Sequence, residues 1–369
     1  MKSQKRILHL IPNLSGGGME RRMGIIAKES CKNFSVHVAY ISEGPNNKDI
    51  SLGKVNLHRI KIKNNYDPRL LFEIFFLITK LRPVFIQTWS IQMDIVGGLL
   101  ALITRHKHIL MEPISPQDNN SKKFDFKQFF KEIIAKNAIV ISNSNLGKIY
   151  WEAKRARKSL LIRNGFDIEE IINVKEKLPK DLERFLCEDK FIVVASRLSK
   201  TSIHKQINVI LKTYKNIINI NPDLKLVICG GGPLQNKYEK IVIEYGIKSK
   251  VFFTGFIKRQ KLWCIFKKAS LFISLSRFEG MPNSVIEAAL CRTPLFLSAI
   301  PTHLEVIPKN MAYFTSNYNS LDLGTQILNY LENSKMIKRR ADELFKKVNK
   351  YSTEFMIKEY INIYKQFES

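Results

Sequence analysis

Two glutamates, Glu279 and Glu287, surround the predicted start of an apolar helix. Pro282 fits the first helical position. An N–H at that position has no intrahelical partner, so the absence of an N–H in proline costs nothing there. Three further N–H groups in that turn also lack a partner inside such a helix, those of Asn283, Ser284 and Val285. Together with the helix dipole, these donors favour an anion or a polar, sugar-like ligand. Two carboxylate acceptors would therefore lie beside a group of backbone donors.

The segment RFEGMPNSVIEA, which follows an apolar run, resembles the signature of the retaining nucleotide-sugar glycosyltransferases of the GT-B fold, family 4. The resemblance implies that Glu279 contacts the hydroxyls of the donor sugar and that Glu287 holds the ribose hydroxyls of the nucleotide. It also implies that the residues between them line the donor site: Gly280, Met281, Pro282, Asn283 and Ser284. Two glutamates eight residues apart also occur by chance, and the alternative is that Glu287 is an ordinary solvated helix residue.

Two cations follow the strand predicted at Phe191 to Ser196. Arg197 and Lys205 match the pair that this family uses for the nucleotide diphosphate. A departing diphosphate gains negative charge as the sugar bond breaks, and fixed cations stabilise that charge in a site shielded from water. An Arg and a Lys at this spacing are usually surface residues, so the assignment depends on their place after the strand. We interpret the neighbouring His204 as structural.

Three consecutive glycines, Gly16, Gly17 and Gly18, separate a predicted first strand from a predicted helix. A backbone without side chains at a helix N-terminus can approach a phosphate closely. The pattern is not GxGxxG, so a dinucleotide fingerprint is not supported. The segment HLIPNLSGGGMERR resembles the glycine loop of the same family, which implies contact with the donor phosphate. A turn without a ligand is the alternative.

Trp89 opens a segment in which the family usually has a His three residues later; here that position is Gln92. Gln donates and accepts hydrogen bonds but gains no charge near neutral pH, so we expect Gln92 to position a hydroxyl and not to carry a proton.

In the second half of the chain, the turn that contains Gly232 resembles the family's second glycine turn. The resemblance also implies that Phe256 lies beside the nucleotide base.

Alternating strand and helix patterns predict an α/β chain with parallel sheets covered by helices on both faces. By resemblance, we expect two Rossmann-like, doubly wound domains that face each other across a cleft. The predicted divisions are an acceptor-side domain at 1–167, a charged linker at 168–189, a nucleotide-sugar domain at 190–350, and a terminal helix at 351–369 that returns to the first domain.

One predicted helix is amphipathic and basic. Its apolar residues recur at helical spacing: Phe126, Phe129, Phe130, Ile133 and Ile134. Lysines surround them: Lys122, Lys123, Lys127, Lys131 and Lys136. Such a helix can lie on an anionic membrane. It can also pack its apolar face on the sheet, and both hold if only the outer aromatic residues face lipid.

The composition is typical of a globular enzyme: 369 residues, 45% hydrophobic and 25% charged. Sixty Lys and Arg against 33 Asp and Glu give a net charge of +27, which attracts polyanions or an anionic membrane surface. The apolar runs are too short for a membrane span, and the first apolar segment is predicted to be a strand and not a signal peptide. Five widely spaced cysteines indicate neither a disulfide framework nor a zinc site and favour a cytoplasmic location.

These features predict a retaining glycosyltransferase that moves a sugar from a nucleotide-sugar, with UDP as the expected nucleotide, to a lipid-linked or surface-polysaccharide saccharide. No Asp-x-Asp motif occurs, so we expect no metal and no cofactor. The expected location is the cytoplasm, peripheral on the inner face of the cytoplasmic membrane. One alternative is a sugar-nucleotide epimerase of the same fold. Another is a noncatalytic polyanion-binding protein, although no nucleic-acid recognition motif is present.

Overall fold

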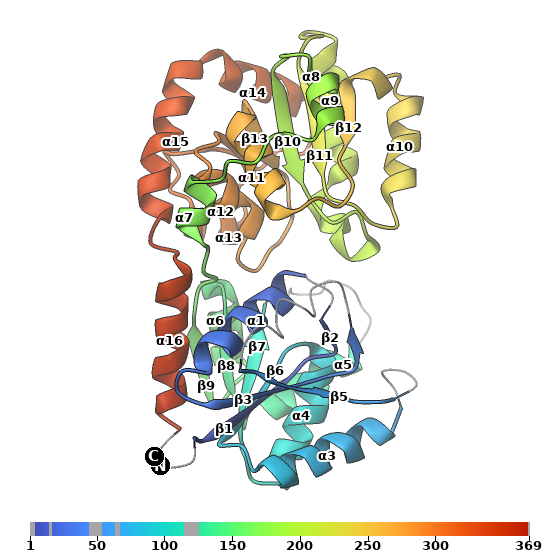
Figure 1. Ribbon diagram of the computed structural model, residues 1–369. Helices are drawn as coiled ribbons and strands as arrows, with labels where there is room; N and C mark the ends of the chain where they lie inside the picture. The colour runs from blue at the N-terminus through green and yellow to red at the C-terminus, as the bar shows by residue number, and fades with distance from the viewer. Residues whose placement is uncertain (1–3, 15–16, 44–53, 63–66, 114–124, 368–369) are drawn as a thin grey trace. The chain divides into compact units, whose positions relative to one another are not determined.

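The computed structural model describes residues 4–14, 17–43, 54–62, 67–113 and 125–367. The chain divides into two compact units. Unit 1 contains residues 1–165 and 353–369, and unit 2 contains residues 166–352. Each unit has its own parallel sheet (Figure 1).

The sheet of unit 1 has seven parallel strands in the order β5-β3-β1-β6-β7-β8-β9. Their bounds are β1 Arg6–Leu10, β3 Ser35–Tyr40, β5 Asn56–Arg59, β6 Phe85–Thr88, β7 Lys107–Glu112, β8 Ile139–Ser142 and β9 Lys158–Leu161. A short pair, β2 (Asn13–Leu14) and β4 (Ser42–Glu43), lies outside this sheet. In the register of the sheet, Leu8 lies opposite His37 on one side and Ile86 on the other.

Helices cover both faces of this sheet because neighbouring strand residues point to opposite sides. The helices are α1 Gly18–Ser30, α3 Arg69–Leu81, α4 Ile91–Ile103, α5 Phe126–Ala135, α6 Asn145–Ala153 and α16 Thr353–Lys365. Ile7 packs in one core with α1 and α16, whereas Leu8 packs in another with α3 and α4. The terminal helix α16 thus belongs to unit 1, where Tyr360 accepts a hydrogen bond of 2.5 Å from Arg22.

The sheet of unit 2 has six parallel strands in the order β12-β11-β10-β13-β14-β15. The strands are β10 Phe191–Ala195, β11 Lys225–Cys229, β12 Val251–Phe253, β13 Leu271–Ser274, β14 Leu295–Ser298 and β15 Tyr313–Thr315. The α-helices are α7 Ile168–Ile172, α8 Lys180–Leu186, α9 Ile207–Ile218, α10 Gln235–Glu244, α11 Arg259–Lys268, α12 Asn283–Leu290, α13 Pro301–Val306, α14 Ser320–Glu332 and α15 Ser334–Val348. Two 3₁₀ helices, η1 Lys200–Lys205 and η2 Lys248–Lys250, complete the unit.

The predicted α/β class with doubly wound parallel sheets is confirmed. The predicted linker at 168–189 is wrong, because this segment folds as α7 and α8 and belongs to unit 2. Ile171, Leu182 and Leu186 of these helices are buried in one core of that unit. The charged residues that suggested a linker cover the outer faces of two short helices. The structure thus divides at 165/166 and 352/353, against the expected 167 and 350.

Helix α5 packs its inner face on unit 1 and leaves aromatic side chains outside. Ile134 is buried, whereas Phe126, Phe129, Phe130 and Ile133 are exposed. Lys131, which the sequence suggested to be one of the surrounding basic residues, is also buried. It pairs with Glu112 at 2.8 Å and with Asp94 at 3.2 Å.

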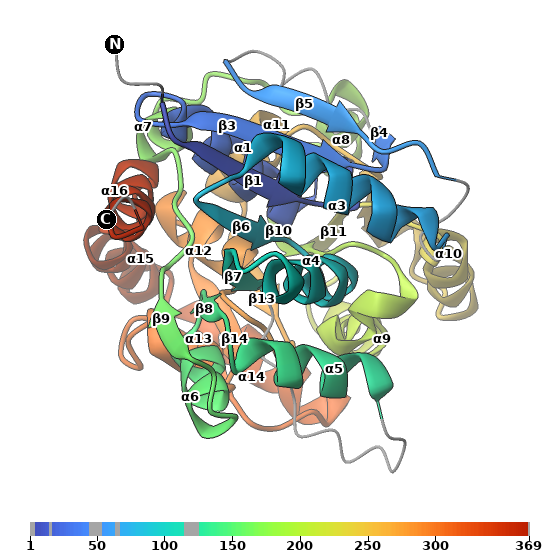
Figure 2. The same ribbon diagram turned by 90° about the horizontal axis from the view of Figure 1, so that it is seen from below.

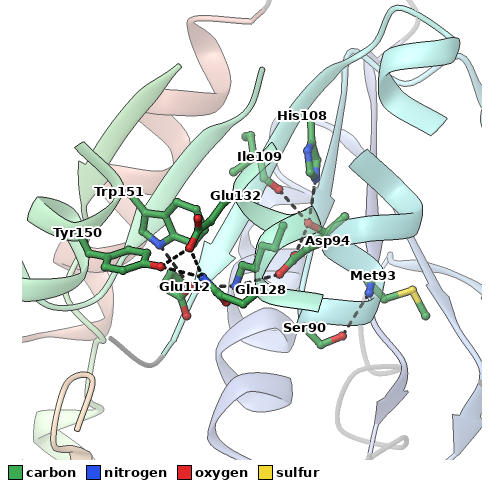
Figure 3. A network of polar contacts seen from close by, with 12 residues as sticks. Ser90, Met93, Asp94, His108, Ile109, Glu112, Gln128, Glu132, Tyr150 and Trp151 are labelled. Atoms are coloured by element: carbon green, nitrogen blue, oxygen red, sulfur yellow. Dashed lines mark hydrogen bonds and ion pairs between the residues drawn. The ribbon is translucent and has the colours of Figure 1, made fainter. Parts of the chain in front are cut away.

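This buried network joins α4, α5, α6 and β7 (Figure 3). Thr88 Oγ1 donates to Asp94 at 2.6 Å, and Trp151 Nε1 donates to Glu112 at 3.2 Å. Burial raises the pKa of Asp94 to about 6, although Lys131 and the Thr88 hydroxyl act in the opposite direction. Nearby carboxylates overcome the effect of burial on Lys131 and raise its pKa. The charge of Lys131 is therefore required inside the unit.

Among the described helices, none combines the length and apolar character that crossing a bilayer requires.

Candidate functional site

In each sheet the chain starts at a central strand, β1 or β10. It then adds strands first on one side of that strand and afterwards on the other. In unit 2, β10 lies between β11 and β13, so the sheet has its topological switch point between β10 and β13. Ligands of open α/β sheets bind beyond the carboxyl ends of the strands at such a point. The candidate donor site of unit 2 is built from the loops that follow these strands.

Lys205 and Glu279 form an ion pair at this switch point. Lys205 ends the 3₁₀ helix after β10, and Glu279 lies in the loop after β13. Ser276 Oγ donates to the same carboxylate oxygen, Glu279 Oε1, at 2.7 Å. Burial acts to raise the pKa of Glu279, but Lys205 and Ser276 outweigh it, so the pKa is lowered overall. The site therefore holds an ionised carboxylate beside a cation.

Two histidines lie near this pair. The ring of His204 stacks on Phe278 with a centroid distance of 4.3 Å, and its backbone oxygen accepts from Arg277 N at 3.0 Å. His303 on α13 is fully buried, its Nδ1 lies 2.9 Å from Ser298 O, and burial lowers its pKa to about 4. Ser298 Oγ in turn donates to Ser276 O at 2.6 Å, so a neutral His303 supports the loop of Glu279 through Ser298 without adding charge. The stacking of His204 agrees with its interpretation as structural.

Arg197 is exposed on the loop after β10. Two glycines of the neighbouring turn allow this loop to pack closely. A Cβ at Gly230 would lie 2.2 Å from Ser196 O, and one at Gly232 would lie 2.4 Å from Leu198 O. Both have positive φ, +115° and +155°, so a side chain there would meet both a clash and backbone strain. Gly232 is thus required by the packing of the Arg197 loop, whatever it contributes to a ligand.

Phe256 follows β12 and is 82% exposed. An ideal Cβ on Gly231 would lie 3.1 Å from Phe256 N, so Phe256 borders the glycine turn at the carboxyl edge of the sheet. Its exposed ring is accessible for stacking on a planar base.

The N-terminus of α12 differs from the predicted one in two respects. The helix begins at Asn283, and Pro282 is its N-cap with ψ of 81°, so Pro282 is not the first helical residue. Val285 N–H is bonded to Pro282 O at 3.1 Å, so it is not an open donor. Gly280, Met281 and Pro282 are buried, whereas Asn283 and Ser284 are half-buried at the start of the helix.

Glu287 is buried, which contradicts its alternative interpretation as a solvated helix residue. Its Oε1 lies 3.1 Å from the Arg259 guanidinium and accepts from Trp263 Nε1 at 3.2 Å. Both partners belong to α11, so Glu287 joins α11 to α12. Whatever ligand contact Glu287 makes, it is also part of the packing between these helices.

In unit 1, Gly17 and Gly18 lie where α1 begins, and Gly16 lies outside the described residues. Gly17 is the N-cap, without a side-chain hydrogen bond. A Cβ at Gly17 would lie 2.4 Å from Glu20 Oε2, so the carboxylate of Glu20 lies directly over this glycine. A phosphate that approaches Gly17 has to displace that carboxylate.

Gln92 lies half-buried in the first turn of α4, after β6 at the switch point of the first sheet. It lines a cavity of about 280 Å³. The other lining residues come from the start of α3, from α4 and from α5: Asp67, Pro68, Leu70, Leu71, Ile95, Val96 and Lys127. The cavity is mostly apolar, with Gln92, Asp67 and Lys127 as its polar groups.

Within unit 2, the structure thus places Arg197, Lys205, Gly232, Phe256 and Glu279 on loops at the same edge of one sheet. Sequence reasoning missed Ser276 and His303, which support Glu279. It also missed the burial of Lys131. Ile134 and Ala135 follow Lys131 by three and four residues and therefore share its helix face. This spacing was the signal that could have predicted the burial of Lys131.

Within the described ranges, no three or more His, Cys, Asp or Glu side chains are grouped so that they could hold a metal ion. The expectation of a metal-independent reaction stays a prediction.

Comparison with known families gives a match to residues 175–347, which fit the family described as glycosyl transferases group 1. Among curated proteins, the poly(ribitol-phosphate) alpha-N-acetylglucosaminyltransferase of Staphylococcus aureus is 26% identical over 256 residues, which are 67% of this chain and 49% of that protein. The N-acetylgalactosamine-N,N'-diacetylbacillosaminyl-diphospho-undecaprenol 4-alpha-N-acetylgalactosaminyltransferase of Campylobacter jejuni is 30% identical over 135 residues, 37% of this chain and 33% of that protein. The chain spans about half of the first relative and a third of the second.

Solved structures with a similar fold match nearly the whole chain. Anabaena Alr3699/HepE in complex with UDP-glucose has a TM-score of 0.82 at 16% identity, covering 98% of this chain and 99% of that one. Sucrose-phosphate synthase of Thermosynechococcus elongatus has a TM-score of 0.81 at 17% identity, with 98% and 99% covered. At these identities the likeness shows the fold. The chain therefore has the GT-B fold, and the match of its second unit to the group 1 glycosyl transferases supports a glycosyltransferase.

Proposed function

We propose that the protein is a retaining glycosyltransferase that moves a sugar from a UDP-sugar to a lipid-linked or surface-polysaccharide saccharide on the cytoplasmic side of the membrane. The observation that carries this proposal is the Lys205–Glu279 ion pair at the switch point of unit 2, with exposed Arg197 on the loop after β10. The group 1 family match covers both the Lys205 and Glu279 positions. Family 4 is the assignment that we propose within that group.

Each side chain has a role in this proposal. Arg197 and Lys205 stabilise the charge that the diphosphate gains as its bond to the sugar breaks. Glu279 accepts hydrogen bonds from the sugar hydroxyls, Glu287 from the ribose, and Phe256 stacks on the base. Before the donor binds, Glu279 neutralises Lys205. The diphosphate then replaces Glu279 as the partner of Lys205, which leaves the carboxylate available for the sugar.

The reaction exchanges one bond for another. The bond between the anomeric carbon and the phosphate oxygen breaks, and a bond from that carbon to the acceptor oxygen forms on the same face. The leaving phosphate takes the proton of the acceptor hydroxyl, so no protein base is required. Gln92, which cannot carry a charge near neutral pH, orients a hydroxyl in this scheme.

The nature of the acceptor is proposed from relatives and from the apolar cavity beside Gln92. The Campylobacter relative is named for an undecaprenol-linked acceptor, and the Staphylococcus relative for a poly(ribitol-phosphate). Both names describe large anionic acceptors, which suit a chain of net charge +27.

The test is a binding titration with UDP, GDP, ADP and CMP, followed by a turnover assay with UDP-sugars, with and without a chelator. We expect UDP to bind tightest and Lys205→Ala to weaken its binding about tenfold or more, because a charged contact is lost. Exposed Lys200→Ala on the same 3₁₀ helix is the control and should bind as the wild type does. Release of free UDP without any acceptor product would favour the epimerase, and salt-sensitive RNA binding without turnover would favour the polyanion-binding protein.

A further inference from the structure

Unit 1 exposes many large apolar side chains on three adjacent helices. Seven of them are between 43% and 65% exposed: Phe72 and Phe76 on α3, Leu99, Leu102 and Ile103 on α4, and Phe130 and Ile133 on α5. Single exposed apolar residues are normal on a protein surface, but a contiguous patch marks an interaction site. We call these seven side chains the apolar face.

The three helices that carry the apolar face are neighbours. Helix α4 packs between α3 and α5, as both views show (Figures 1 and 2). The cavity beside Gln92 is lined by residues from the N-terminal ends of all three helices, so these ends meet there. On α4 the outward stripe runs from Gln92 through Ile95 and Leu99 to Ile103, at helical spacing. The apolar face therefore leads along α4 to the proposed acceptor cavity.

The opposite sides of the same helices are already packed. Ile74 and Ile78 of α3 lie in the core against the sheet, and Lys131 and Ile134 of α5 are buried. The inner sides of α3 and α5 therefore pack in the core. On the outer sides, the ring contacts of Phe76 and Phe130 are with their chain neighbours Phe75 and Phe129, and both rings stay at least half exposed.

Positive charge surrounds the apolar face. Exposed cations lie near the ends of the three helices: Lys80, Arg82, Arg105, Lys127 and Lys136. Glu73 of α3 is exposed beside Phe72, whereas two other acidic residues of this region are engaged. Asp125 caps the start of α5, and Asp67 pairs with Arg69 at 2.6 Å. Apolar side chains with a surrounding excess of Lys and Arg are the composition that partitions into the interface of an anionic bilayer.

We infer that α3, α4 and α5 form the surface by which this protein rests on an anionic bilayer, with the apolar face inserted among the lipid headgroups. The inference deepens the proposed function. It brings the mouth of the Gln92 cavity to the membrane surface, where a lipid-linked acceptor is held. A second copy of the chain is the alternative occupant that the experiment has to distinguish.

The experiment is flotation of the full chain with vesicles of equal parts phosphatidylglycerol and phosphatidylcholine, and with vesicles of phosphatidylcholine alone, at low salt. The test variant is Phe72→Ser with Phe130→Ser. The control is Ile243→Ser with Leu321→Ser, which removes apolar side chains of similar exposure from unit 2. We expect binding to the anionic vesicles, weakened about tenfold or more in the test variant and unchanged in the control.

UDP binding, which needs no membrane, shows that each variant is folded and tests the proposed function separately. If the wild type does not bind anionic vesicles, or if the test variant binds them as well as the control does, the inference is wrong. It is also wrong if sedimentation shows a dimer that only the test variant dissociates while vesicle binding persists, because a second copy then covers the apolar face.

Discussion

Lys205 and Glu279 are 74 residues apart in the chain and form an ion pair at the carboxyl edge of the second sheet. They meet because β10 and β13 are neighbours in that sheet, so the loops that follow these strands lie side by side. The pair keeps a cation and a carboxylate at the place where we propose that a diphosphate and a sugar hydroxyl bind.

The two side chains should therefore be coupled in catalysis. Lys205→Ala is expected to lower kcat/KM by about 10²- to 10³-fold, the effect of removing one well-placed donor to developing charge. Glu279→Gln should also lower it, and the double variant should lose less than the product of the two single losses, because each single variant leaves a partly buried group without its ion-pair partner. A double-mutant cycle on kcat/KM measures this. Fully additive losses would show that the pair does not act as a unit.

Much of the fold was predictable from the sequence, because strands and helices produce local patterns of apolar and polar residues. The glycine turns and the helix after Pro282 were placed within one or two residues. The pairing of Lys205 with Glu279 was not predictable, since it depends on strand order. The burial of Lys131 was missed for another reason: lysine is almost always exposed, and only the two carboxylates from α4 and β7 make its burial favourable.

Lys131 should be essential for the stability of unit 1. Lys131→Met leaves Asp94 and Glu112 buried without their cation, and breaking a buried pair in this way costs about 3 to 5 kcal/mol of unfolding free energy. Lys136→Met, an exposed change on the residue after α5, should cost less than about 0.5 kcal/mol. Denaturant unfolding measures both. Equal stabilities of the two variants would contradict a structural role for the buried charge.

The pKa of Asp94 predicts a pH dependence of stability. The folded protein raises this pKa to about 6 from an ordinary 3.8, so the folded state holds the proton more tightly than the unfolded state does. The unfolding free energy should therefore fall as the pH rises from about 4 to about 6, by up to about 3 kcal/mol. Asp94→Asn removes the titrating group and should flatten this slope. Glu73→Gln on the surface of α3 should keep the slope, and an identical slope in Asp94→Asn would disprove the assignment.

The position of Glu287 raises the question of whether it binds ligand or only joins α11 to α12. Trp263→Phe removes the indole N–H that donates to Glu287 but keeps the carboxylate and its pairing with Arg259. We expect Glu287→Ala to weaken UDP binding about tenfold or more, through loss of hydrogen bonds to a charged group, and Trp263→Phe to weaken it much less. Isothermal titration of both variants decides the question. Equal losses would mean that Glu287 acts only by holding the two helices together.

Gln92 offers a test of how much the reaction depends on an uncharged side chain at the proposed acceptor site. It lines the apolar cavity of unit 1 with Lys127, and the sequence resemblance places a His at this position in related enzymes. Gln92→Ala should lower turnover, because a hydroxyl loses its partner. Gln92→His should keep most of the activity and add an ionisation to the pH profile of kcat/KM near or below 6.5, since the cavity is apolar and Lys127 disfavours a second positive charge. The matched substitution Gln260→His in unit 2 should leave the profile unchanged. If Gln92→His gives the wild-type profile at every pH, the side chain at position 92 does not contact the reacting groups, and its proposed role in orienting the acceptor has to be given up.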